Sequence, residues 1–127
     1  MRVSSVYRTE PVGFRDQPVF YNAVARILWR GTPKGLLALV QWIERTLGRA
    51  PTFRNGPRRI DIDLLDFDGA VSRGADPALP HPRLSQRRFV LGPLAEIAPE
   101  WRHPISGRTA RELLEDLPPR PWARRMT

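Results

Sequence analysis

The chain has 127 residues, a net charge of +8 and no cysteine, which excludes disulfides, thiolate metal sites and a cysteine nucleophile. No apolar run approaches the length of a membrane span, and the N-terminus lacks a signal-peptide core. We therefore expect a single cytoplasmic domain over residues 1–127, without a membrane partner.

The positive charge comes almost wholly from arginine, since Lys34 is the only lysine. It leaves three interpretations open: binding to a nucleic-acid backbone, binding to a small polyanion such as a nucleoside triphosphate, or a solvated arginine-rich surface. The basic residues are spread along the chain except in the tail at Arg120–Arg125, and no RNA-binding aromatic signature is present. Nucleic acid is thus the disfavoured partner.

Alternating residues predict two strands, at residues 3–9 and 20–29, that pair in antiparallel fashion across a turn-rich loop. Phe20 and Asn22 share one face of the second strand. An aromatic plane beside an amide that donates and accepts hydrogen bonds could bind a flat polar ring. Taken alone, the pair fits an ordinary strand-end aromatic beside a satisfied asparagine better.

A helix is predicted from residue 33 to 47, with Thr32 as N-cap, Pro33 at the first helical position and Gly48 as C-cap. Its apolar stripe comprises Leu36, Leu39, Val40, Ile43 and Leu47. Gln41 and Glu44 share a face of this helix. Without further context they indicate a solvent-facing polar pair.

The stretch RNGPRRIDIDLLDFDG at residues 54–69 combines a Gly-Pro turn with an apolar strand. On that strand Asp61 and Asp63 point to one side, roughly 6.8 Å apart at the backbone. Two such carboxylates suit Mg²⁺ with phosphates completing its shell, and the preceding arginines suit phosphate oxygens. A bare Asp-x-Asp, however, is more often a solvated strand face. Asp68-Gly69 indicates a hairpin turn.

The segment LPHPRL places His81 between two prolines, which holds it in an extended backbone. This histidine could bind phosphate or simply pack, and the two interpretations are equally supported. Residues 89–91 are apolar, and 94–97 indicate a short helix or turn. A last helix is predicted from 109 to 117 with a capping box from Thr109 to Glu112. The basic tail, residues 118–127, is expected to be loose.

Taken together, these segments resemble the 6-hydroxymethyl-7,8-dihydropterin pyrophosphokinase family of folate biosynthesis. The resemblance runs from about residue 3 to 117 and is most specific in the signature R-x-G-P-R-x-x-D-I-D-L-L that starts at residue 54. Supporting segments are SSVYRTEPVG, DQPVFYNAV, the helix with Gln41 and Glu44, LPHPRL and RRFVLGPLAEIAPEW. Several motifs in the right order are far more specific than any one of them.

The resemblance implies an α+β, ferredoxin-like antiparallel sheet with helices on one side. It implies transfer of pyrophosphate from ATP to the hydroxymethyl group of the pterin, with two Mg²⁺ ions held by Asp61 and Asp63. By resemblance, Arg49 and Arg58 would serve in catalysis and bind the phosphates, and His81 and Arg87 would also surround the phosphates. Gln41 and Glu44 would line the nucleotide side. The pterin would be held by Phe20 and Phe89 as a sandwich, by Asn22 at its amide edge, and by backbone at Thr9 and Val12.

The family begins with a strand, a Gly-Ser-Asn loop and a helix, whereas this chain starts at the equivalent of the second strand. We expect the true start to lie upstream of Met1. The alternative is a shortened relative that pairs with another chain, or one that binds nucleotide or pterin without turnover. Glu10 and Pro82 also stand where the family often has proline and tyrosine. Self-association or association with another folate enzyme stays open.

Overall fold

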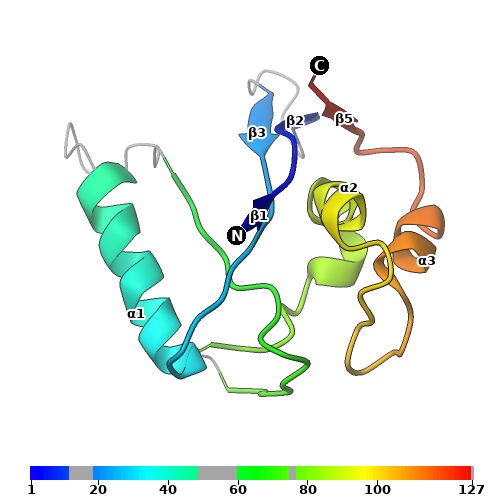
Figure 1. The fold of residues 1–127 in the computed structure, drawn as a ribbon. Helices are drawn as coiled ribbons and strands as arrows, with labels where there is room; N and C mark the ends of the chain where they lie inside the picture. The colour runs from blue at the N-terminus through cyan, green and yellow to red at the C-terminus, as the bar shows by residue number, and fades with distance from the viewer. Residues whose placement is uncertain (12–18, 49–59, 75–76, 127) are drawn as a thin grey trace. The chain divides into compact units, whose positions relative to one another are not determined.

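The structure is a computed structural model that describes residues 1–11, 19–48, 60–74 and 77–126 (Figure 1). Contacts divide it into two units, which we describe separately. The first unit comprises Met1–Leu28 and Pro82–Thr127, and the second comprises Trp29–His81.

In its described residues the first unit carries five short antiparallel strands. They are β1 (Arg2–Val3), β2 (Tyr7–Thr9), β3 (Phe20–Asn22), β4 (Ala25–Arg26) and β5 (Ala123–Arg125). Within the described residues, β1 pairs with β4, and β2 lies between β3 and β5. The predicted pairing of the two N-terminal strands is confirmed, but each predicted strand is split in two.

A β-bulge causes the split. The Ser4 N–H donates to the Val24 carbonyl at 2.8 Å, and the next ladder pair is Tyr7 with Asn22. Two residues, Ser5 and Val6, therefore face Ala23 alone. The Ser5 N–H leaves the ladder and donates to the Glu96 carboxylate at 2.9 Å. This bond satisfies a backbone donor that the bulge would otherwise leave without a partner.

The C-terminal tail differs from the loose segment that the sequence predicts. Ala123–Arg125 forms β5 and pairs with β2 from Tyr7 to Thr9. Glu10 anchors the approach. Its N–H donates to the Trp122 carbonyl at 2.9 Å, and its carboxylate accepts from the Trp122 N–H at 3.0 Å and forms an ion pair with Arg120. The physical reason is the second edge of β2, whose backbone groups need partners that the tail supplies.

Two helices cover the core of the first unit, α2 (Arg88–Ile97) and α3 (Ala110–Glu115). Helix α2 contacts β2, β3, β5 and α3. The buried apolar residues of this unit are Tyr7, Leu84, Val90, Leu91, Leu94, Ile97, Ala110 and Leu113. The predicted capping box of α3 is confirmed: the Glu112 N–H donates to the Thr109 hydroxyl at 3.1 Å, and the Thr109 N–H donates to the Glu112 carboxylate at 2.9 Å.

Helix α1 (Pro33–Ile43) belongs to the second unit and continues as a π-helical turn over Glu44–Gly48. It begins as predicted, with the Gly35 N–H donating to the Thr32 hydroxyl at 3.1 Å. Its buried strip is narrower than the apolar stripe predicts. Leu36 and Val40 are buried, whereas Leu39 and Leu47 are 38% and 65% exposed.

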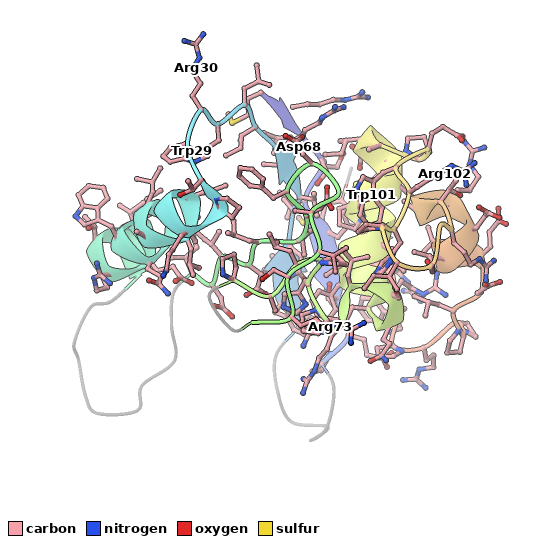
Figure 2. The ribbon with its side chains drawn as sticks, turned by 90° about the horizontal axis from the view of Figure 1, so that it is seen from below. Trp29, Arg30, Asp68, Arg73, Trp101 and Arg102 are labelled. Carbon is pink, nitrogen blue, oxygen red and sulfur yellow. The ribbon has the colours of Figure 1, made fainter. Side chains whose placement is uncertain are left out.

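The segment after residue 60 is not a ladder strand in the structure, contrary to the sequence prediction. The expected turn is present at its end, where Asp68 and Gly69 have φ of 50° and 72° and the Ala70 N–H donates to the Phe67 carbonyl at 2.9 Å. Figure 2 shows Asp68 at this bend. Beyond it, Ser72 and Leu79 pair through two backbone bonds of 2.8 and 2.9 Å.

The fold class is α+β with antiparallel sheets, as the sequence predicts for a ferredoxin-like protein. None of the helices in the described ranges has the length and apolar character needed to cross a bilayer.

Candidate functional site

An aromatic pair lies where β3 meets the start of α2. Phe20 opens β3, and Phe89 is the second residue of α2. Their ring centroids are 5.5 Å apart with the planes at 78°, an edge-to-face contact. The guanidinium of Arg87 lies over the Phe89 ring, 5.3 Å from its centroid. Three predicted residues from two distant parts of the sequence are thus brought together.

A polar pair lies on the same face of the sheet. Thr9 is 1% exposed, and its hydroxyl donates to Asn22 Oδ1 at 2.8 Å. The ladder pairs Thr9 with Phe20, so Asn22 is its diagonal neighbour two residues further along β3. Asn22 and Phe20 therefore share a face, as the sequence predicts, and both side chains are partly exposed.

The second unit holds the predicted aspartates. Asp61 and Asp63 are exposed, while Ile62 and Leu64 are half-buried, the alternation of an extended segment with one solvent-facing side. The Ile62 N–H donates to the Glu44 carboxylate at 2.8 Å. Glu44 thus accepts from a backbone donor that lies outside any ladder in the described residues. It also holds the aspartates beside the end of the helical segment.

His81 and Gln41 belong to the same unit. The His81 N–H donates to the Leu65 carbonyl at 2.8 Å, which ties the histidine segment to the aspartate segment. Gln41 is exposed on α1. In the ranges that the structure describes, no group of three or more His, Cys, Asp or Glu residues gathers as a metal cage. The predicted residues Val12, Arg49 and Arg58 lie outside the described residues.

Sequence reasoning missed Glu96, which organises the first unit. Its carboxylate accepts from the Ser5 N–H and hydroxyl at 2.9 and 3.1 Å and from the Tyr7 hydroxyl at 2.9 Å. Arg125 of β5 lies 3.6 Å away. The Ser5 backbone bond is the main cause that lowers the pKa of Glu96, with the Tyr7 and Ser5 hydroxyls adding to it. A glutamate on a helix carries no signal of such distant partners.

Arg88 is a second residue that the sequence did not single out. Its guanidinium donates to the carbonyls of Leu117 and Pro118 at 3.1 and 2.6 Å. These bonds join the start of α2 to the chain after α3. The residue before Phe89 is thus tied to the chain after α3, while α2 itself contacts the sheet.

Comparison with known proteins matches residues 1–99 to the model of the 7,8-dihydro-6-hydroxymethylpterin-pyrophosphokinase family. The chain belongs to this family. The match includes every predicted site residue, from Thr9 to Phe89.

Named relatives agree with this family. A 2-amino-4-hydroxy-6-hydroxymethyldihydropteridine pyrophosphokinase of Methylorubrum extorquens is 47% identical over 91% of this chain and 72% of its own length. The enzyme of the same name from Bacillus subtilis is 46% identical over 76% of this chain and 58% of its own length. The folic acid synthesis protein of Dictyostelium discoideum is 39% identical over 91% of this chain, which spans only 18% of that relative.

Proposed function

We propose that this chain transfers the pyrophosphoryl group of ATP to the hydroxymethyl group of 6-hydroxymethyl-7,8-dihydropterin, giving AMP and the pterin diphosphate. The observation that carries the proposal is the Phe20–Phe89 pair beside Asn22, which provides aromatic faces next to an amide. Membership of the pyrophosphokinase family supports the same substrate.

The aromatic pair would bind the pterin by opening. With 5.5 Å between centroids and 78° between planes the rings are in edge-to-face contact, so they must turn and move apart before a flat heterocycle can lie between them. Asn22 then supplies hydrogen bonds at the ring edge, and backbone at Thr9 and Val12 would complete the pocket. A pterin stacked and bonded in this way holds its hydroxymethyl oxygen in position, which is what an in-line displacement at phosphorus requires.

The residues present also fit magnesium. Asp61 and Asp63 offer exposed carboxylate oxygens on one side of an extended segment, the hard ligands that Mg²⁺ prefers when phosphates complete its shell. We propose that these two aspartates hold two ions, whose chemistry is to neutralise charge on the ATP phosphates. Glu44 acts on this site by holding Ile62 between the two aspartates.

Cationic residues would complete the phosphate site, with Arg49, Arg58, His81 and Arg87 around the phosphates and Gln41 and Glu44 at the nucleotide. In the reaction the hydroxymethyl oxygen forms a bond to the β-phosphorus, the bond from that phosphorus to the α-phosphate oxygen breaks, and AMP leaves. The hydroxyl proton goes to solvent. Positioning and charge neutralisation suffice for such a step, so no protein nucleophile is needed.

The test measures AMP formed from Mg·ATP by the full chain, with and without the pterin. We expect pterin-dependent AMP, reduced on the order of 10²-fold or more in Asp61→Asn and Asp63→Asn, which keep shape and remove charge. Asp68→Asn is the matched control, because it removes a carboxylate from the turn of the same segment, and asparagine tolerates its positive φ. Full turnover in both site variants overturns the metal assignment, and binding of ATP and pterin without AMP overturns the transfer.

Two broader proposals accompany this function. We infer a cytoplasmic location, where ATP and the pterin are available, and a catalytic unit that uses the whole of residues 1–127. Self-association stays a prediction, which light scattering of the purified chain measures. Association with another folate enzyme stays a prediction as well.

A further inference from the structure

The segment that joins α3 to β5 is bonded to the start of α2. We call this segment, residues 117–123, the connector. The Arg88 guanidinium donates to the carbonyls of Leu117 and Pro118 at 3.1 and 2.6 Å. Arg88 is the first residue of α2 and directly precedes Phe89 of the aromatic pair. One end of the connector is thus attached beside one of the two rings.

The other end of the connector is bonded to the chain that follows β2. The Glu10 N–H donates to the Trp122 carbonyl at 2.9 Å, and the Glu10 carboxylate accepts from the Trp122 N–H at 3.0 Å and from the Arg120 guanidinium. Thr9, the residue before Glu10, pairs with Phe20 in the ladder. This end is thus attached one residue from the ladder partner of the second ring.

The sequence of the connector makes it stiff. Pro118, Pro119 and Pro121 fix their own φ angles, and each restricts the residue before it. All three prolines are exposed, so this stiffness comes from the covalent rings and not from packing. A stiff segment that is bonded at both ends keeps the distance between its attachment points, whereas a flexible segment lets that distance vary.

We propose that Glu10 and Arg88 are positioning residues that attach the connector to the two sides of the ring site, so that the connector limits how far Phe20 and Phe89 separate. This inference rests on the proposed function. The edge-to-face rings must move apart to admit a pterin, and a site whose walls vary in position must be ordered when the ligand binds. Releasing either end of the connector therefore weakens pterin binding roughly 3- to 10-fold.

The test measures binding of 6-hydroxymethylpterin to the full chain by calorimetry, with Mg²⁺ and a non-hydrolysable ATP analogue present. Glu10→Ala removes the carboxylate contacts at one end, and Arg88→Met removes the donors at the other. We expect each to weaken pterin binding roughly 3- to 10-fold, and Glu10→Gln and Arg88→Lys, which keep an acceptor and a donor, to weaken it less. In Glu10→Ala the affinity for the ATP analogue alone should stay within about twofold of wild type.

The double variant distinguishes one connector from two separate anchors. In the described residues no hydrogen bond joins Glu10 to Arg88. Separate anchors give additive losses, whereas two ends of one connector give a double variant within about twofold of the weaker single variant. Pro119→Gly, which removes no hydrogen-bonding group, should also weaken pterin binding, whereas Pro104→Gly in the loop before α3 should not. Additive losses, or wild-type pterin affinity in Pro119→Gly, overturn the proposal.

Amide exchange in the ligand-free chain separates this inference from the proposed function. The Glu10 N–H is compared by NMR with the Ala98 N–H, which donates to the Leu94 carbonyl at 2.8 Å. Arg88→Met and Pro119→Gly should raise the ratio of the two exchange rates roughly 3- to 10-fold.

A general loss of stability would speed the exchange of both amides alike, and an unchanged ratio overturns the proposal even where the chain makes AMP. If wild type binds no pterin, the proposed ring site is refuted and the limit on the two rings falls with it. The exchange ratio still decides in that case whether the connector couples its two ends.

Discussion

Tyr7 offers a direct measurement of how β2 is held to α2. The side chain is 8% exposed, and its hydroxyl donates to Glu96 at 2.9 Å. Burial first, and then the hydrogen bond to Glu96 and its negative charge, raise the pKa of Tyr7 from 10.0 to about 12, against an opposing effect of Arg125. We predict that ionisation of this one hydroxyl is coupled to unfolding of the first unit.

The direction follows from proton binding. Above the ordinary pKa, unfolded chains lose the tyrosine proton while folded chains keep it, so the stabilisation is fully present below pH 10.0 and is lost as pH rises through about 12. Each pKa unit corresponds to about 1.36 kcal/mol, which makes roughly 2.7 kcal/mol the upper limit for this shift. Solvent near the hydroxyl screens part of it, so we expect about 1–2 kcal/mol.

The assay uses Tyr21→Phe, because the chain has two tyrosines and this change leaves Tyr7 alone. Tyrosinate absorbance and urea unfolding are followed from about pH 9 to about pH 12. In the same background, Tyr7→Phe should lower the free energy of unfolding by roughly 1.5–3 kcal/mol at neutral pH, a deficit that shrinks as pH rises. Ionisation of Tyr7 near its ordinary pKa in a chain that is still folded would refute the reasoning, as would a deficit that is independent of pH.

Two further changes test local anchors. Glu44→Leu removes the acceptor of the Ile62 N–H and should raise the KM for Mg·ATP roughly 5- to 10-fold. Glu44→Gln keeps an acceptor oxygen and should raise the KM less. Steady-state kinetics that give the two variants the same KM would contradict the anchoring role. Thr109→Ala removes the N-cap of α3 and should lower the free energy of unfolding by about 1 kcal/mol, measured in urea, whereas Thr109→Ser keeps the hydroxyl. Equal losses in the alanine and serine variants would show that the cap hydroxyl is not the cause.

Features that depend on a few neighbouring residues were predictable. The capping box at Thr109 and Glu112 and the Asp68-Gly69 turn both appear where their residues indicate. The shared face of Phe20 and Asn22 follows from strand alternation. In each case the decisive bond or backbone angle lies within one turn or one strand, so the residue types suffice.

Features that depend on partners far along the chain were not predictable from the sequence. Helix α2 runs through Gly92 and Pro93, residues that disfavour a helix, because Pro93 is packed below 2% exposure. The segment with Asp61 and Asp63 alternates in exposure as predicted but forms no ladder, and the distant Glu44 accepts from its Ile62 N–H. Local pattern limits which conformations are available, and only packing decides between them.

The sequence by itself determined the family and the local turns and caps, because their motifs are written in contiguous residues, and it named the aromatic, amide and carboxylate residues that we propose for the site. Tertiary structure alone decided that Glu96 bonds across more than eighty residues to Ser5 and Tyr7, that the tail completes the sheet beside β2, and that the buried Thr9 hydroxyl donates to Asn22. These bonds form because buried donors and unpaired strand edges take whichever partner the folded chain brings near, and residue type does not name that partner in advance.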